Sequence, residues 1–211
     1  PYNLSLKFYD NPYYWNWQTN DGYLAKYFPQ KGDIVIDAGA YVGTFTLVAS
    51  RLVGQQGRVI AFEPDPQNYN KLLQNIKYNE ANNVTVVNKG LWSEDTILKG
   101  DSARSGTVSF RVGDDIDDSS MTVEVVSLDN ELERLNIHKV DFIKMDIEGA
   151  ELAALEGAIK TLTSNNLQLA IASYHIVDGQ QTFMKLEEQL GRLGYKTETA
   201  FPPWLVTYAW K

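Results

Sequence analysis

The sequence contains no cysteine, which excludes a disulfide framework, a thiolate zinc site and a cysteine nucleophile, and fits a reducing compartment. It also lacks any apolar run near the ~20 residues of a membrane-spanning helix, and no signal-peptide segment opens it. Basic residues are few: 19 Lys and Arg stand against 27 Asp and Glu, for a net charge of −8. This charge disfavours nonspecific binding to nucleic acid or to an anionic membrane. We therefore expect a cytoplasmic protein with no membrane span and no nucleic-acid partner.

The rest of the composition is that of an ordinary globular domain. Of the 211 residues, 44% are hydrophobic and 22% are charged, values that exclude a disordered chain, a collagen and a coiled coil. A chain of this length builds one core that is large enough to need no cross-link. We expect a single domain over residues 1–211. Because the first residue is Pro1 rather than Met, we expect some N-terminal sequence to precede it.

Short strand-like runs alternate with helical stretches from Gly32 onward. We expect strands at 33–37, 57–62, 84–87, 140–145 and 167–172, and helices at 43–53, 65–79, 149–162 and 181–193. Strands that alternate with helices form βαβ units, whose parallel sheet is covered by helices on both faces. The nearly continuous apolar character of the strands agrees with this burial. The fold class is therefore α/β.

One internal segment interrupts this alternation. Residues 107–112 and 121–126 alternate apolar and polar side chains with a period of two. The acidic loop 114–118 lies between them, so we expect an inserted β-hairpin over residues 101–126 with a mobile tip.

The two ends of the chain have features of their own. Runs at 195–201 and 205–210 flank a pair of prolines, and strands joined so closely must be antiparallel, which predicts a closing hairpin. Residues 1–29 are rich in aromatic side chains. We expect a helix that packs these side chains on the sheet edge or on a partner chain, such as a second copy of this one; the alternative is a lid over the ligand crevice. These aromatic residues are Tyr9, Tyr13, Tyr14, Trp15, Trp17, Tyr23, Tyr27 and Phe28.

The strongest local signal is the turn after the first strand. The strand ends in Asp37, and Gly39 and Gly43 follow before a helix begins. In an open parallel sheet such a turn lies at the switch point where ligands bind. We expect Gly39 to let a ligand approach the backbone, and Asp37 to bond turn amides or, through water, an amino group. Tyr41 stands where a dinucleotide fold has its second glycine, which disfavours NAD and favours a ligand without a diphosphate.

Further candidate ligand contacts follow the next two strands. Glu63 comes directly after the second strand, where a carboxylate can accept both hydroxyls of a ribose; the alternative is a solvated turn acid. After the third strand, Gly90 and Leu91 can bracket an adenine by backbone contacts and apolar cover. Trp92 fits an adenine contact and a core position equally well.

Together these residues resemble the class I S-adenosylmethionine-dependent methyltransferases, and more narrowly the FkbM family. The similar runs are Asp37–Gly43, Phe62–Pro64, Ser127–Asp129 and, most specifically, Lys144–Glu151, within a resemblance over about residues 32–193. The resemblance implies a Rossmann-like fold with a mostly parallel seven-stranded sheet that closes in an antiparallel hairpin. It also implies methyl transfer from S-adenosylmethionine to a hydroxyl of a small-molecule or glycan acceptor. The chain departs from the family pattern at Tyr41, where the family usually has Asn.

The residues expected to face this acceptor follow the fourth and fifth strands. Asp146 ends the fourth strand, where its carboxylate can orient a hydroxyl or steer the sulfonium. His175 ends the neighbouring fifth strand and is placed to take a proton from the hydroxyl; the alternative is a partly buried histidine bonded to the backbone. Glu148 and Glu151 either take part or only favour the dipole of the helix they begin. The expected catalytic residues are Asp146, Glu148 and His175.

The favoured function is therefore an O-methyltransferase, and three other interpretations remain beside it. A Mg²⁺ ion held by Asp146 and Glu148 is disfavoured, because the fifth strand ends in Ser-Tyr-His rather than in an acid pair, and we expect no metal. A domain that only binds a partner is the second, and an NAD(P)-dependent oxidoreductase is the third and least favoured. The expected cofactor contacts are Asp37, Gly39, Tyr41, Gly43, Glu63, Gly90, Leu91 and Asp146.

Overall fold

The structure is a computed structural model, and it describes most of the chain. The described residues are 6–8, 22–102, 108–110, 121–177, 179–202 and 204–211. The aromatic residues expected to form a cap at Tyr9–Trp17, and the expected acidic loop 114–118, lie outside them.

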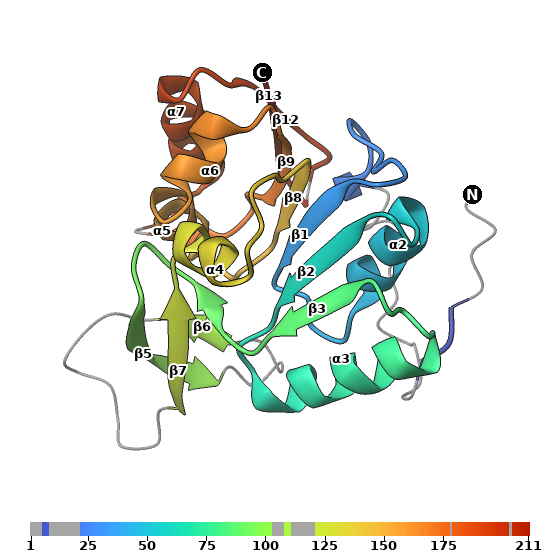
Figure 1. The fold of residues 1–211 in the computed structure, drawn as a ribbon. Coiled ribbons are helices and arrows are strands. Elements are labelled where there is room, and N and C mark those ends of the chain that lie inside the picture. The colour runs from blue at the N-terminus through green and yellow to red at the C-terminus, as the bar shows by residue number, and fades with distance from the viewer. Residues whose placement is uncertain (1–5, 9–21, 103–107, 111–120, 178, 203) are drawn as a thin grey trace.

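A seven-stranded sheet forms the centre of the fold, in the order β12-β13-β9-β8-β1-β2-β3 (Figure 1). Strands β1, β2, β3, β8 and β9 pair in parallel, whereas β13 runs antiparallel to both of its neighbours, β9 and β12. The mostly parallel sheet and its closing hairpin are thereby confirmed. The bounds are β1 Ile34–Ala38, β2 Arg58–Phe62, β3 Val84–Val87, β8 Phe142–Met145, β9 Gln168–Ala172, β12 Lys196–Ala200 and β13 Val206–Trp210.

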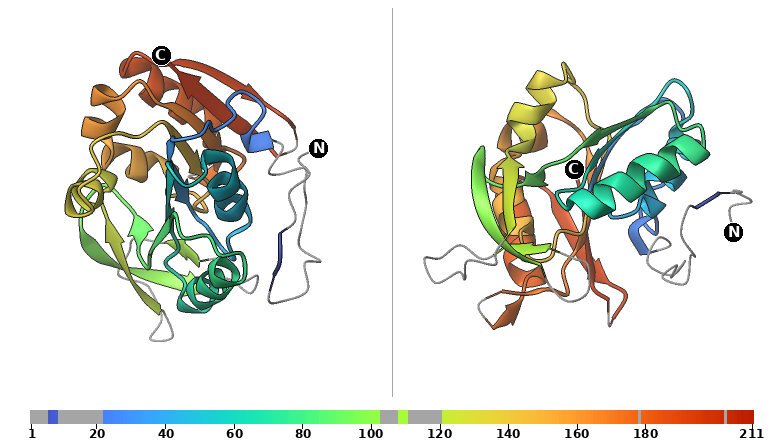
Figure 2. Two further views of the ribbon diagram at one scale, coloured as in Figure 1. Left: turned by 45° about the vertical axis from the view of Figure 1, so that its right-hand side comes forward. Right: turned by 90° about the horizontal axis from the view of Figure 1, so that it is seen from below.

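Helices cover both faces of this sheet (Figure 2). Helices α2 and α3 lie on one face, and α4, α5, α6 and α7 lie on the other. Alternate residues of each strand supply the two cores: Val35 and Phe142 pack on the α2 side, while Ile36 and Ile143 pack on the side of α5 to α7. The bounds are α2 Thr44–Val53, α3 Pro66–Tyr78, α4 Leu128–Arg134, α5 Glu151–Glu156, α6 Ile159–Ser164 and α7 Phe183–Arg192.

Local chemistry explains where two of these helices begin. The Asp65 carboxylate accepts hydrogen bonds from the backbone N–H groups of Gln67 and Asn68 at 2.8 Å each, with Pro66 in the first turn. Ser127 caps α4 by accepting a hydrogen bond from the Asn130 N–H at 3.3 Å. The sequence predicted the start of α3 at Asp65 and Pro66. It did not predict helix α4.

The helix expected at 149–162 is two helices, α5 and α6, with a break at Gly157. A Cβ atom at this position would overlap the carbonyl oxygen of Trp92, so only glycine lets the two backbones approach so closely. The Gly157 carbonyl also accepts a hydrogen bond from the Asp129 N–H at 3.0 Å, which ties the break to α4.

A second, smaller sheet replaces the expected hairpin. Its order is β4-β7-β5-β6, so β6 and β7, the two strands expected to pair with each other, both pair with β5 instead. The segment that forms β5 contains Lys99, Gly100 and Asp101, which weaken the alternating pattern, and the sequence therefore did not indicate a strand there. The bounds are β4 Gly90–Leu91, β5 Thr96–Ser102, β6 Val108–Phe110 and β7 Met121–Val126.

A short ribbon follows β9 and leads into α7. Strands β10 (Ile176–Val177) and β11 (Gln180–Gln181) pair antiparallel, and the backbone N–H of Thr182 bonds the carbonyl of His175 at 3.0 Å. This ribbon fixes the chain directly after His175.

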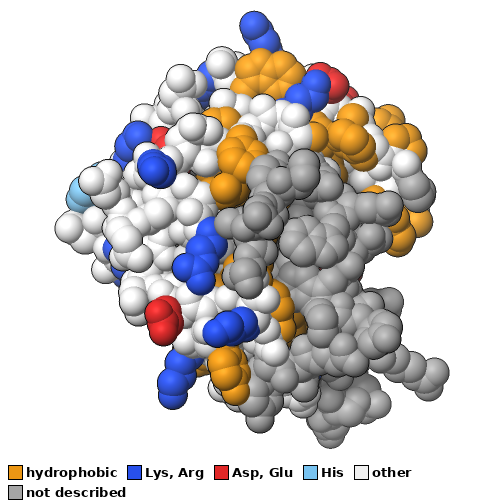
Figure 3. Space-filling view, turned by 90° about the vertical axis from the view of Figure 1, so that its right-hand side faces the viewer, with side chains coloured by type: hydrophobic (Ala, Val, Ile, Leu, Met, Phe, Trp, Pro, Cys, Tyr) orange, Lys and Arg blue, Asp and Glu red, His pale blue; other side chains and the backbone are white. Residues whose placement is uncertain are grey.

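Basic side chains on one face of the molecule are spread out rather than gathered (Figure 3). On the face shown in Figure 3, the Lys and Arg side chains of the described residues are scattered among apolar and neutral groups. Within the described part of the chain, no helix is both long and apolar enough to cross a membrane.

Candidate functional site

The carboxyl ends of four neighbouring strands meet near the middle of the sheet. Strand β1 lies between β2 and β8, and β9 follows β8, so the chain order reverses between β1 and β8. This is the switch point at which open α/β sheets bind ligands. The sheet brings Gly39, Glu63, Asp146 and His175 to this edge, as the sequence predicted.

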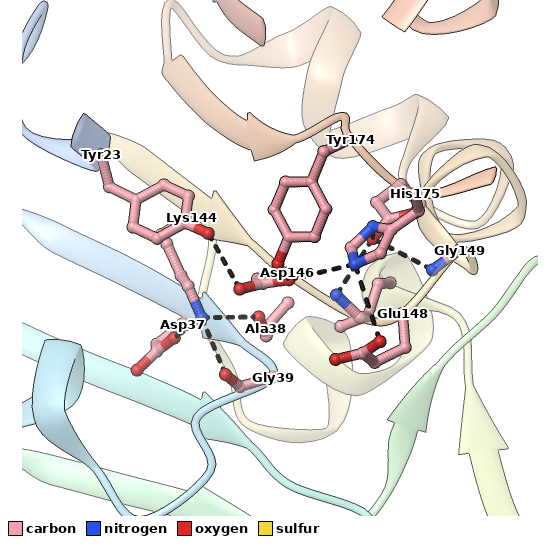
Figure 4. Close-up of polar contacts among 12 residues, drawn as sticks. Tyr23, Asp37, Ala38, Gly39, Lys144, Asp146, Glu148, Gly149, Tyr174 and His175 are labelled. Carbon is pink, nitrogen blue, oxygen red and sulfur yellow. Dashed lines mark hydrogen bonds and ion pairs between the residues drawn. The ribbon is translucent and has the colours of Figure 1, made fainter. Parts of the chain in front are cut away.

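A buried ion pair supports the loop after β1 from inside the protein (Figure 4). The Nζ of Lys144 lies 3.0 Å from Oδ1 of Asp37, and it donates hydrogen bonds to the carbonyls of Ala38 and Gly39 at 3.2 and 2.7 Å. The other oxygen of Asp37 accepts a hydrogen bond from Thr46 at 2.5 Å. Asp37 has no exposed surface. Lys144, whose role the sequence left open, therefore neutralises Asp37, and Asp37 acts on the loop rather than facing an open site.

Gly39 is required by the protein's own backbone. It has a positive φ of 76°, and a Cβ atom there would overlap the carbonyl oxygen of Asp146. The sequence interpretation assigned this glycine to the approach of a ligand, whereas the structure shows that the end of β8 occupies the space. Gly43 caps α2, and Tyr41 lies between the two glycines with a φ of 52° and 37% of its surface exposed.

Glu63 joins the loops that follow β1 and β2. Its Oε2 accepts a hydrogen bond from the Tyr41 N–H at 2.7 Å, and its Oε1 accepts one from the Asp65 N–H at 3.0 Å. Only 5% of the residue is exposed. Burial raises the pKa of Glu63 to about 7, although the two backbone hydrogen bonds act in the opposite direction. Glu63 is thus a buried carboxyl group at the switch-point edge of the sheet, and each of its oxygens has a further lone pair.

Gly90 and Leu91 do not line an open surface. Both are buried in β4, where they pair with β7, and Leu91 packs in the main core beside Phe62. We expected these two residues to bracket an adenine, but the structure places them inside the paired strand β4 instead. Trp92 packs against the core of the small sheet, which favours the structural interpretation of this side chain.

Two tyrosine hydroxyls hold the Asp146 carboxylate. Tyr23 donates to Oδ2 at 2.9 Å, and Tyr174 donates to Oδ1 at 3.2 Å. Burial, followed by the charge of Asp146, raises the pKa of both tyrosines, so both remain protonated donors. Tyr23 belongs to the aromatic N-terminal segment, and nothing in its local sequence pattern indicates a contact with Asp146.

The imidazole of His175 lies among three carboxylates. Its Nδ1 lies 3.0 Å from Oε1 of Glu151, while its Nε2 lies 3.5 Å from Asp146 and 3.7 Å from Glu148 (Figure 4). Burial lowers the pKa of His175, but the contact with Glu151 and the charges of all three acids raise it, and the net shift is upward. Burial also raises the pKa of Glu148.

Glu151 does more than favour a helix dipole. It is fully buried, and its Oε1 accepts hydrogen bonds from the N–H groups of Ile147 and Gly149 at 3.1 and 3.3 Å. The same oxygen faces His175, so Glu151 ties the loop after β8 to the end of β9. The sequence named both residues but did not show that they touch.

The site as a whole carries an excess of negative charge. Asp146, Glu148 and Glu151 surround a single imidazole, and the charge of Lys144 is already paired with Asp37. Such a group favours a positively charged ligand and offers several oxygen and nitrogen acceptors to a hydroxyl proton.

Comparisons with known proteins find methyltransferases. The model of the methyltransferase FkbM domain matches residues 37–197. The chain is 28% identical over 145 residues to the hexuronic acid methyltransferase AglP of Haloferax volcanii, an alignment that covers 65% of this chain and 54% of that protein. The alignments with curated relatives cover 54% to 59% of their lengths, so the chain spans little more than half of each.

Solved structures show the same fold. A methyltransferase FkbM from Methylobacillus flagellatus matches with a TM-score of 0.66 at 23% identity, over 91% of this chain and 47% of that one. The fibrillarin of Aeropyrum pernix, solved with natively bound S-adenosyl-L-methionine, matches with a TM-score of 0.56 at 13% identity, over 85% and 67% of the two chains.

Proposed function

Since the chain belongs to the FkbM methyltransferase family, we propose that it transfers a methyl group from S-adenosylmethionine to a hydroxyl of a sugar, a glycan or a related natural product. The observation that carries the proposal is the group formed by Asp146, Glu148 and His175 at the switch point of the sheet. The relative named as a hexuronic acid methyltransferase supports a sugar acceptor.

The cofactor side of the proposal rests on Glu63 and on the loop after β1. Glu63 is a buried carboxylate with spare lone pairs at the end of β2, where ribose hydroxyls would donate to it. Tyr41 fills the place of a dinucleotide glycine, which disfavours a diphosphate. The carboxylates around His175 suit a sulfonium cation. When bound, S-adenosylmethionine supplies an activated methyl group on positively charged sulfur.

The acceptor side consists of Asp146, Glu148 and His175. Asp146, held by two tyrosine hydroxyls, orients the acceptor hydroxyl, and the half-exposed Glu148 gives access from solvent. The oxygen of the hydroxyl would bond the methyl carbon as the carbon–sulfur bond breaks and S-adenosylhomocysteine leaves, and the hydroxyl proton would pass to this group of side chains. Alignment of the reacting atoms and removal of one proton are the main tasks, and side chains held in fixed positions contribute to both.

Binding of S-adenosylhomocysteine tests the cofactor assignment first. A ligand that binds only the folded state stabilises it by about 2.7 kcal/mol at a hundredfold excess over its dissociation constant. We expect S-adenosylhomocysteine to raise the melting temperature and NAD to leave it unchanged. The reverse pattern would identify an oxidoreductase, and no shift with either would remove the cofactor from the proposal.

A further inference from the structure

Three buried atoms on the acceptor side have no hydrogen-bond partner among the described residues: Nδ1 and Nε2 of His175 and Oε2 of Glu151. Nδ1 still lies 3.0 Å from Oε1 of Glu151, whereas Nε2, in a side chain with only 9% of its surface exposed, lies 3.5 and 3.7 Å from its two carboxylate neighbours. The Nε2 atom is aimed between the carboxylates of Asp146 and Glu148, at distances too long for hydrogen bonds (Figure 4). A buried polar atom without a partner costs free energy, so this position calls for a ligand.

We propose that Asp146, Glu148 and His175 bind a divalent cation of the Mg²⁺ or Mn²⁺ kind. One ligand atom from each residue lies within 4.8 Å of the other two. In an octahedral site with bonds near 2.1 Å, adjacent ligand atoms are about 3 Å apart, so the observed separations of 3.5 and 3.7 Å need only a small closure. Asp146 and Glu148 are partly exposed and can make this movement.

The neighbours of these three residues are those that a metal site uses. Glu151 lies behind His175, where its carboxylate favours the proton on Nδ1 and leaves the lone pair of Nε2 free. Tyr23 and Tyr174 donate to Asp146 and fix its orientation. Outer contacts of this kind orient the ligands of a metal ion and tune their basicity.

The ligand set also selects the kind of cation. Two carboxylates and one imidazole, in a chain without cysteine, favour a hard or intermediate ion with an open coordination sphere over a soft metal. The sequence alone disfavoured a metal, because β9 is not followed by an acid pair. The structure supplies the imidazole of His175 as the third ligand instead.

The role of the cation, unlike its binding, rests on the proposed function. An acceptor hydroxyl that takes one open coordination position becomes more acidic, because the cation stabilises the negative oxygen. With the cation bound, Asp146, Glu148 and His175 are ligands, so the hydroxyl proton passes to solvent water instead of to these side chains. The oxygen bonds the methyl carbon as the carbon–sulfur bond breaks, and S-adenosylhomocysteine leaves.

Binding of Mn²⁺ to the chelator-treated protein tests the site directly. Electron paramagnetic resonance reports the free Mn²⁺ that remains at each step of a titration. We expect one site per chain, with affinity reduced at least tenfold in His175→Ala and in Glu148→Gln. His138→Ala and Glu156→Gln are the matched controls, because both residues are exposed and lie outside the site, and they should bind as the wild type does.

Three results would overturn the inference: no binding by the wild type, equal binding by His175→Ala and His138→Ala, or equal binding by Glu148→Gln and Glu156→Gln. The Glu148 side chain is 37% exposed, so Glu148→Gln should fold. This variant therefore tests the cation site even if His175→Ala does not fold. Titration with S-adenosylhomocysteine separates the two proposals. A protein that binds S-adenosylhomocysteine but not Mn²⁺ would lose only the cation site, and one that binds Mn²⁺ alone would lose only the proposed cofactor.

Discussion

At the scale of single residues, the pair formed by Lys144 and Asp37 decides whether the loop after β1 keeps its shape. The side chains are 6% and 0% exposed, so each charge depends on the other for compensation. Removing one partner of a buried pair leaves an uncompensated charge, which destabilises more strongly than replacing both partners.

Lys144→Met should lower the free energy of unfolding by about 3–5 kcal/mol, measured by urea denaturation. The matched control is Lys139→Met, because the Lys139 side chain is 70% exposed and pairs with Asp141 at the surface. The control should change stability by less than about 1 kcal/mol. Equal losses in the two variants would mean that the ion pair of Lys144 is not buried as described.

Glu63 gives a prediction that depends on pH. Its pKa of about 7 lies above its ordinary value of 4.5, so the folded state holds this proton more tightly than the unfolded state does. The contribution of Glu63 to stability therefore falls as the pH rises from about 4.5 to about 7. Cofactor binding follows the opposite course, because ribose hydroxyls donate most strongly to the ionised carboxylate.

The affinity for S-adenosylhomocysteine should rise about tenfold between pH 6 and pH 8, since the ionised fraction of Glu63 rises by about that factor. Calorimetric titrations of the wild type and of Glu63→Gln measure this. Glu63→Gln should bind weakly and without this pH dependence, whereas Glu156→Gln should match the wild type. A Glu63→Gln variant with wild-type affinity at pH 8 would show that Glu63 does not hold the ribose.

The placement of Glu63, Asp146 and His175 at one edge could be predicted, because the carboxyl ends of parallel strands meet there. The side chains that bond to Asp146 and His175 could not be predicted. Tyr23 reaches Asp146 across 123 residues of sequence, and such contacts depend on packing that no local pattern shows. Glu151 carries the pattern of a first helical turn, which hides its contact with His175.

At the scale of the elements, the close approach of the loop after β1 to the end of β8 shapes the switch point. Gly39 permits this approach, because its φ is positive and the position of a Cβ atom is taken by the Asp146 carbonyl. Gly191 offers a contrast, since it lies inside α7 with open space around the position of its Cβ.

Gly39→Ala and Gly191→Ala should therefore shift stability in opposite directions. We expect Gly39→Ala to lower the free energy of unfolding by at least about 2 kcal/mol, through strain and overlap. Gly191→Ala should raise it by about 0.5–1 kcal/mol, because alanine favours the helix. Thermal denaturation of both variants measures the signs, and a neutral Gly39→Ala would contradict the packing of β8 against this loop.

Element types could be predicted more reliably than element partners. The apolar runs of β1 and β2 and the capping residues of α3 are local signals, and both kinds of element form as expected. Strand β7 pairs with β5, and this pairing depends on the path of the chain between them rather than on the residues of either strand alone. The break at Gly157 likewise depends on the backbone of Trp92, which is distant in sequence.

At the scale of the whole molecule, the order of the strands is what connects sequence to function. It places the loop after β1, the carboxylate after β2 and the ends of β8 and β9 around one switch point. The FkbM model matches the chain across these elements, over residues 37–197. Within that frame, the proposed transfer of a methyl group to a hydroxyl rests on the acidic group around His175.

Transfer of a ¹³C-labelled methyl group from S-adenosylmethionine is the most direct test of the proposed O-methyltransferase. The protein is incubated with hexuronic acids, neutral hexoses and oligosaccharides, and the products are followed by nuclear magnetic resonance, which distinguishes methyl groups on oxygen, nitrogen and carbon. We expect a new methyl ether on a sugar hydroxyl, formed roughly 10²–10⁴-fold more slowly by His175→Ala than by His138→Ala. A methyl group found only on nitrogen or carbon, or a His175→Ala variant as fast as His138→Ala, would contradict the account.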